Sequence, residues 1–254
     1  MSNSIAIIIP TYNEEENIEK LINYIKHYVN NSLIVIVDDS ANNNIEKIIH
    51  DKKLDVSYFN RGKKSGRGSA VLFGFQKIIT KSQINTFIEM DADFSHDPTE
   101  LNRNINFFHE NTLDLLIGSR YLKKSKIINW SLSRRLFSLL ANFLARQLLQ
   151  IPITDFTNGY RIYSRRAVDK IILNCGKIGD GFIILSEILV EIYLNNFKID
   201  EIESIFLNRK RGESSVNLSL IIESFIGLLK IYSKKRKKEK NKSGEKKYFN
   251  HIFY

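Results

Sequence analysis

The sequence predicts an α/β protein whose mostly parallel sheet is covered by helices on both faces. Short, mainly apolar runs alternate with helical patterns through the first half of the chain, as strand–helix–strand units require. Polar residues follow several of these runs directly. Because ligands bind at the carboxyl ends of parallel strands, we expect the functional site among those polar residues.

The expected elements follow one another in order. Strands are predicted over 5–9, 33–37, 56–59, 86–90 and 113–117. Helices are predicted over 14–28, 45–49 and 69–79, and after Pro98, a residue favoured in the first helical turn. In the second half we expect a helix-rich stretch from Trp130, an irregular segment over 155–165, a helix over 182–194, a strand over 199–206 and a helix over 216–232.

Two segments, 130–149 and 216–232, are amphipathic. The first places Leu136, Leu140, Phe143 and Leu144 on one stripe. Such a stripe is typical of a helix that lies in a membrane interface, and equally of a helix that packs on a core. Charged residues interrupt both segments, so we expect neither to span a bilayer.

Positive charge gathers at the C-terminal end of the sequence. Nine Lys and Arg and two Glu lie within 233–254, so this segment carries +7 of the net charge of +10. We expect a basic tail that is disordered or lies on an anionic membrane surface, after an amphipathic helix over 212–232. The rest of the chain is nearly neutral, which argues against a nucleic-acid partner.

The composition is that of a globular protein, with 43% hydrophobic and 26% charged residues in 254. The single cysteine, Cys175, has no partner for an internal disulfide, and no Cys/His cluster has zinc spacing. The apolar run at 5–9 is too short for a signal peptide and lacks a basic start. We therefore expect a cytoplasmic protein.

Asp91 and Asp93 are the strongest candidates for metal ligands. They lie two positions apart where a predicted strand ends, so both carboxylates can approach one cation. Mg²⁺ and Mn²⁺ prefer such oxygen ligands, and Mg²⁺ sites commonly include substrate phosphates. The same short pattern also occurs by chance, as a solvated turn before Pro98. The position at a strand end, like that of Asp38 and Asp39, favours the metal site.

Three further features each allow two interpretations. Asp39 could bind a ribose or a nucleobase edge, or it could cap the weak helix that follows. The Gly- and Lys-rich segment 62–68 suggests a phosphate cradle but fits no known phosphate-loop spacing, so we expect a mobile loop first. Several arginines could clamp a phosphate or be solvated surface charges: Arg120, Arg134, Arg135, Arg161 and Arg209.

Seven motifs occur in order along the chain. They begin at Ile8, Val37, Gly66, Met90, Gly118, Asp155 and Arg209 and read IIPTYNEE, VDDS, GRGSA, MDADFSHDP, GSRY, DFTNGYR and RKRGESS. Together they resemble the motifs of the polyprenol-phosphate (dolichol-phosphate) mannosyltransferases of glycosyltransferase family 2. The resemblance covers about residues 5–232. Seven ordered motifs are far more specific than any one of them.

This resemblance implies a GT-A catalytic domain over 1–211 that transfers mannose from GDP-mannose to a polyprenyl or dolichyl monophosphate, with inversion. It implies Mg²⁺ or Mn²⁺ on Asp91 and Asp93, with Ser95 as a third candidate ligand where the family usually has Gln. It implies catalytic roles for Asp91, Asp93, Arg120 and Asp155. It places the nucleoside on Pro10, Tyr12, Glu14 and Asp39, and the lipid phosphate on Arg120, Arg134, Ser138 and Arg209.

Two positions depart further from the family pattern. Arg67 stands between two glycines where the family usually has an apolar residue, and Ser215 stands where it has Lys, a contact that Lys210 or Arg211 could supply. A lipid monophosphate has a second pKa of about 6, so its attacking oxygen needs positioning more than a general base.

Two alternatives stay open at this stage. A related transferase could use another donor, such as UDP-glucose, or another acceptor, because a few hydrogen bonds set sugar selectivity. A non-catalytic binding protein could keep the fold, although the intact Asp39, Asp91 and Asp93 argue against it. The first hypothesis places the protein peripherally on the cytoplasmic face of a membrane, where an anchoring subunit could accompany it.

Overall fold

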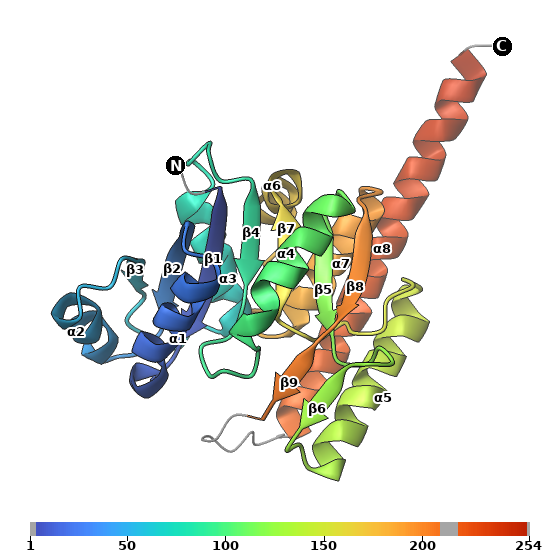
Figure 1. The fold of residues 1–254 in the computed structure, drawn as a ribbon. Helices are drawn as coiled ribbons and strands as arrows, with labels where there is room; N and C mark the ends of the chain where they lie inside the picture. The colour runs from blue at the N-terminus through green and yellow to red at the C-terminus, as the bar shows by residue number, and fades with distance from the viewer. Residues whose placement is uncertain (1–3, 209–217, 253–254) are drawn as a thin grey trace.

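The computed structural model describes residues 4–208 and 218–252, and it contains a seven-stranded sheet between two layers of helices (Figure 1). The strands are β1 (Ile5–Thr11), β2 (Ser32–Asp38), β3 (Ser57–Asn60), β4 (Thr86–Glu89), β5 (Leu115–Ser119), β7 (Arg161–Ser164) and β8 (Ile199–Glu203). They lie in the order β3-β2-β1-β4-β7-β5-β8. Neighbouring strands are parallel except at β7, which runs antiparallel to both β4 and β5.

Helices cover both faces of this sheet, as the sequence predicts. α1 (Glu15–Tyr28), α2 (Asn44–Asp51) and α4 (Leu101–Glu110) pack on one face, and the short turn η1 (Pro98–Glu100) leads into α4. α3 (Arg67–Ile78), α6 (Arg165–Asn174) and α7 (Ile183–Leu194) pack on the other. The α/β fold class is confirmed.

The apolar run of β1 shows why the sequence identifies a central strand. Ile8 points into the core beneath α3, whereas Ile7 and Ile9 point into the core beneath α1 and α4. Successive side chains of a strand alternate between the two faces of the sheet. Because both faces are covered, every position is apolar rather than every second one.

The segment 155–165 was predicted to be irregular, which holds for 155–160, whereas Arg161–Ser164 form β7 and α6 begins at Arg165. β7 begins with Arg161, whose fully buried guanidinium donates hydrogen bonds to the backbone carbonyls of Phe156, Asn158 and Leu185. An arginine in the middle of a sheet carries no β signal in a single sequence, because its burial depends on how the fold arranges its acceptors, here two carbonyls of the preceding loop and one on α7.

A second, two-stranded sheet forms beside the end of the main one. β6 (Lys126–Ile128) pairs in parallel with β9 (Ile205–Leu207). The single strand expected over 199–206 is therefore divided into β8 and β9 at Ser204. α5 (Leu132–Leu149) follows β6 and lies at the same end of the molecule (Figure 1).

The C-terminal segment differs from the expectation of a disordered tail after residue 232. One helix, α8 (Leu218–Ile252), runs through the basic region and extends beyond the rest of the molecule (Figure 1). Lys234 and Lys238 lie one helical turn apart and pair with Glu187 and Glu191 on α7 at 2.7 and 2.6 Å. These pairs neutralise part of the positive charge that would otherwise oppose folding. No helix in the described ranges is long and apolar enough to cross a membrane.

Candidate functional site

The candidate site lies at the edge of the sheet where β1, β2, β4 and β5 end, which we call the carboxyl edge. The parallel pairing of β1 with β2 and β4 brings their ends to this edge. Four predicted site residues lie just after strand ends: Tyr12 after β1, Asp39 after β2, Asp91 two residues after β4, and Arg120 after β5. The rule that polar residues follow parallel strands at a ligand site therefore selects one region of the molecule.

Asp91 is held by a basic side chain that the sequence analysis did not assign to the site. Arg67, the first residue of α3, donates from Nε to Asp91 Oδ1 at 2.6 Å and from Nη2 to the carbonyl oxygen of Gly159 at 2.9 Å. Its Nη1 lies 3.7 Å from Glu89 Oε2. Burial alone would lower the pKa of Arg67, but the charges of Asp91 and Glu89 outweigh it and raise that pKa. Arg67 therefore stays charged.

His96 is a second member of this cluster that sequence analysis left unassigned, although it lies inside the MDADFSHDP motif. Its ring is fully buried, and Nδ1 accepts the backbone N–H of Asp91 at 3.0 Å. The neutral tautomer with a proton on Nε2 then donates to Asn158 Oδ1 at 2.9 Å. Burial lowers the pKa of His96 against the raising effect of Asp91. His96 therefore fixes the turn that carries the two aspartates.

Asp93 and Ser95 complete the loop after β4. The backbone N–H of Ser95 donates to Asp93 Oδ1 at 3.0 Å, and the buried Ser95 Oγ has no hydrogen-bond partner. Two carboxylates and a hydroxyl are the hard oxygen donors that Mg²⁺ and Mn²⁺ prefer, so these residues fit such a cation. Across residues 4–208 and 218–252, no three or more His, Cys, Asp or Glu side chains form a metal cluster. Remaining ligands would have to come from a substrate or water.

The proposed nucleoside residues lie at the other end of the carboxyl edge. Asp39 is buried and accepts from Arg61 Nε and Nη2 at 2.6 and 2.8 Å, and from the backbone N–H of Ser65 at 2.8 Å. Segment 62–68, expected to be a mobile loop, is thereby tied to β2. Tyr12 is 43% exposed, and Lys64 Nζ lies 4.6 Å from its ring centroid. Pro10 and Glu14 are partly exposed beside it.

Arg120 and Asp155 form a buried ion pair at the end of β5. Arg120 donates from Nε and Nη2 to the two oxygens of Asp155, both at 2.8 Å, and also to Thr157 Oγ1 at 2.6 Å. Burial would raise the pKa of Asp155, but the charge of Arg120 and its hydrogen bonds hold that pKa below its ordinary value. Asp155 is fully buried, and both of its carboxylate oxygens accept from Arg120.

Arg120 and Arg134 meet on the same aromatic ring. Their guanidinium carbons lie 5.3 and 4.3 Å from the ring centroid of Trp130. Arg134 Nη1 also donates to Asn208 Oδ1 at 2.7 Å. Ser138, one turn further along α5, accepts a 2.5 Å hydrogen bond from the Tyr121 hydroxyl. Two converging guanidinium groups with neighbouring hydroxyls suit an anionic group such as a phosphate.

Two other arginines of the predicted phosphate clamp, Arg135 and Arg161, do not join this pair. Arg161 is fully buried and donates to the backbone carbonyls of Phe156, Asn158 and Leu185, so its place in the clamp was wrong. Arg135 is exposed and donates to the carbonyl oxygen of Ile127. Arg209, Lys210, Arg211 and Ser215 lie outside the described residues.

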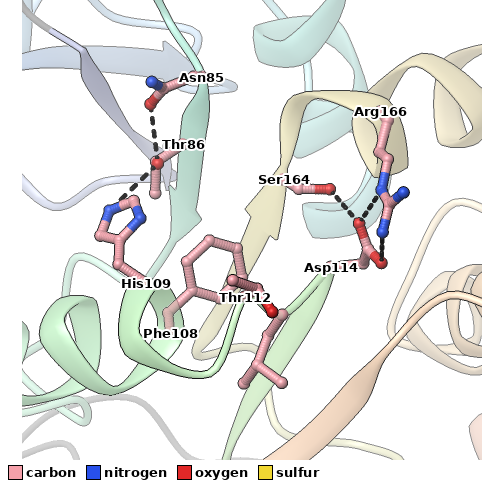
Figure 2. Close-up of a pocket in the computed structure, with 9 residues that line it drawn as sticks. Asn85, Thr86, Phe108, His109, Thr112, Asp114, Ser164 and Arg166 are labelled. Carbon is pink, nitrogen blue, oxygen red and sulfur yellow. Dashed lines mark hydrogen bonds and ion pairs between the residues drawn. The ribbon is translucent and has the colours of Figure 1, made fainter.

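A pocket of about 270 Å³ lies at the opposite edge of the sheet (Figure 2). The residues around it include Thr86 at the start of β4, His109 near the end of α4, and Asp114 just before β5. Asp114 accepts from Arg166 Nη2 at 2.6 Å and from Ser164 Oγ at 2.7 Å. None of the predicted site residues lines this pocket, so it is separate from the carboxyl edge.

Comparisons with known proteins agree with the geometry. The glycosyl transferase family 2 profile matches residues 6–172. A polyprenol monophosphomannose synthase of Mycolicibacterium smegmatis is 33% identical over 222 residues, which are 86% of this chain and 83% of that protein. A dolichol-phosphate mannosyltransferase of Pyrococcus furiosus is 34% identical over 227 residues, which are 86% of this chain but 61% of the longer relative.

Solved structures share the fold at lower sequence identity. Glucosyl-3-phosphoglycerate synthase from Mycobacterium tuberculosis, in complex with Mn²⁺, UDP-glucose and phosphoglyceric acid, has a TM-score of 0.65 at 15% identity. The match covers 91% of this chain and 80% of that one. The same enzyme with Mg²⁺ and UDP has a TM-score of 0.63 at 16% identity, with the same coverage. These likenesses show a GT-A fold, as expected.

Proposed function

Since this chain belongs to glycosyl transferase family 2 and is a glycosyltransferase, we propose that it transfers mannose from GDP-mannose to a polyprenyl or dolichyl monophosphate. The names of its two curated relatives support this acceptor class and this sugar. The proposed product is a lipid phosphate that carries the sugar with inverted configuration.

The proposal rests on the contacts of the segment 155–159. This segment contacts residues near Asp91, on the proposed side of the nucleotide donor, and Arg120, on the proposed side of the lipid acceptor. Asp155 holds Arg120 on the acceptor side. Asn158 and Gly159 contact His96 and Arg67, which fix Asp91 on the donor side. The charge of Asp91 also contributes to the raised pKa of Arg120. The proposed site therefore combines carboxylates that would hold the metal of a nucleotide diphosphate with arginines that would hold the lipid phosphate.

The chemistry follows from these groups. When bound, a divalent cation on Asp91, Asp93 and Ser95 would neutralise charge that builds up on the departing diphosphate. Pro10, Tyr12, Glu14 and Asp39 would hold the nucleoside.

On the acceptor side, Arg120, Arg134 and Ser138 would hold the lipid phosphate, with Arg209 as a further proposed contact. Because this phosphate is already ionised near neutral pH, these groups need to aim its oxygen at the anomeric carbon rather than remove a proton. Attack in line with the departing diphosphate inverts the configuration at that carbon.

Exposed apolar side chains on α5 and α8 would suit a lipid substrate. Leu132, Leu136, Leu139, Leu140 and Phe143 on α5 and Phe225, Ile226 and Leu229 on α8 are exposed, and we call this set the α5–α8 apolar surface. Arg134 and Ser138 belong to the same helix α5. We propose that this surface rests on the cytoplasmic face of a membrane and receives the lipid chain while the arginines take its phosphate.

A transfer assay tests the proposal. Purified protein with Mg²⁺ or Mn²⁺ is expected to move radiolabelled mannose from GDP-mannose to polyprenyl phosphate in detergent or liposomes, and a panel of other nucleotide sugars identifies the preferred donor. Asp93→Asn keeps an acceptor for the Ser95 N–H but removes the charge, so we expect a loss of about 100-fold or more in transfer.

Asp97→Asn is the matched control for that substitution. Asp97 lies in the same loop and caps η1 through Thr99, a role that Asn also fills, so activity should stay near that of the wild type. Folded protein that transfers sugar from no donor to any lipid phosphate would reject the proposed function.

A further inference from the structure

We propose that Arg67 is a built-in cation that competes with the divalent metal for Asp91 and keeps metal affinity low until the nucleotide donor is bound. This inference rests on the proposed function, because it concerns the metal of that reaction. It starts from the contact between Arg67 Nε and Asp91 Oδ1, which is 2.6 Å long.

Arg67 is fixed in place from several sides. Only 11% of its side chain is exposed, and its Nη2 donates to the carbonyl oxygen of Gly159. The guanidinium also lies 5.7 Å from the ring centroid of Phe182. Gly159 leaves the space that the group fills, because a Cβ added there would collide with the guanidinium. The position is therefore built into the fold and is not one rotamer of a mobile surface side chain.

The charges at this position explain the competition. Glu89 and Asp91 both lie within ion-pair distance of Arg67, so the guanidinium neutralises part of the negative charge that would attract a metal. A dication on Asp91 would stand close to a fixed positive charge. Repulsion between such charges at a few ångströms, even with the screening typical of proteins, corresponds to a change of about tenfold or more in affinity.

A nucleotide diphosphate reverses this balance. The negative charge of the diphosphate compensates the positive charge of the metal beside Arg67. We therefore expect the free protein to bind the metal weakly, and the metal to bind together with the nucleotide donor. An apolar residue at position 67 would not impose this order. The presence of Arg67 thus sets when the metal enters, while Asp91 and Asp93 set where it would be held.

Titration of the full chain with Mn²⁺ in the absence of nucleotide tests this directly by calorimetry. We expect Arg67→Gln to bind Mn²⁺ at least about tenfold more tightly than the wild type. Arg67→Lys, which keeps the charge, should stay within about threefold of the wild type. Equal or weaker binding by Arg67→Gln would overturn the inference.

Arg166→Gln is the matched control. It also removes an arginine from an ion pair with an aspartate, but at the pocket on the opposite edge of the sheet, so Mn²⁺ affinity should not change (Figure 2). A change as large as that in Arg67→Gln would contradict a local effect.

Gly159→Ala provides a second route that keeps every charge. The added methyl group would displace the guanidinium from Asp91, so Mn²⁺ binding should again become tighter, and this variant decides the question if Arg67→Gln does not fold. Unchanged affinity in Gly159→Ala would then overturn the inference. Because no sugar transfer is measured, the outcome does not depend on the donor or acceptor, and failure of the proposed function would instead appear as absent transfer by the wild type.

Discussion

At the scale of single residues, the site depends on charges that are buried in pairs. Arg120 with Asp155, Arg61 with Asp39, and Arg67 with Asp91 each place a guanidinium against a carboxylate at the carboxyl edge. Removing one member of a buried pair leaves the other uncompensated, which costs more than the net contribution of the pair itself. These residues therefore affect stability as well as binding.

The pair of Arg120 and Asp155 gives a prediction for stability and its pH dependence. Asp155→Asn should lower the free energy of unfolding at pH 7 by about 3–5 kcal/mol, because Arg120 stays buried without its counter-charge. Because the folded-state pKa of Asp155 is lowered, its contribution is present above the unfolded pKa of about 3.9 and is lost as the pH falls through the folded value.

Denaturant unfolding of both proteins between pH 7 and pH 3 measures this contribution. The difference between wild type and Asp155→Asn should shrink toward the acidic end. Asp55→Asn is the control, since the side chain of Asp55 is 94% exposed and its removal should have little effect. If the free energies of unfolding of the two proteins differed by the same amount at every pH, the lost stability would not come from the charge of Asp155.

At the scale of elements, two ion pairs connect α7 and α8, and we call these two pairs the ladder. Glu187 and Glu191 on α7 are almost fully buried and receive Lys234 and Lys238 from α8. Glu187 also accepts the backbone N–H of Gly176, and Lys234 donates to the carbonyl oxygen of Asn174. A helix that presents two lysines one turn apart can satisfy both glutamates in one register, so the ladder fixes how α8 lies on the domain.

Lys234→Ala should loosen this joint. It removes the partner of a buried carboxylate, and we expect a loss of about 1–3 kcal/mol in the free energy of unfolding together with faster amide hydrogen exchange in α8. Hydrogen-exchange mass spectrometry measures the second effect. Lys237→Ala changes an exposed lysine of the same helix and should alter neither quantity. Equal exchange in the two variants would show that the ladder does not hold α8.

At the scale of the whole molecule, charged side chains and exposed apolar side chains occur on neighbouring elements. The carboxyl edge carries the ion pairs, and α5, whose leucines are exposed, lies next to α8 (Figure 1). Arg134 and Ser138 stand on α5 among these leucines. A lipid with a charged headgroup and an apolar tail matches this arrangement, since each part meets groups of its own kind.

Leu136→Asp should weaken binding to anionic liposomes. Leu136 is 69% exposed on the α5–α8 apolar surface, so the substitution adds charge to a face that would contact lipid without opening a cavity in the core. We expect a drop of about tenfold in the partition coefficient from liposome sedimentation. Leu173→Asp on α6 is the control, because Leu173 is exposed to a similar degree, 67%, away from this surface. Equal sedimentation of both variants would remove α5 from the membrane contact.

The fold class, and the edge of the sheet at which the candidate site residues lie, could be predicted from the sequence alone. Apolar runs such as that of β1 reveal burial directly, and the polar residues after them mark strand ends whatever the rest of the chain does. Asp91, Arg120 and Asp39 were found in this way. Their roles in binding remain predictions.

What those residues contact follows from the packing of the whole chain. Arg67 reaches Asp91 across 24 positions and Gly159 across 92, and the buried Arg161 of β7 reaches the carbonyl oxygen of Leu185 across 24. Two lysines of the helical tail meet glutamates of α7, a contact between elements far apart in the sequence. Periodicity reports which face of an element is buried, but the partner of a buried charge is set by how distant segments pack, and no local pattern contains that information.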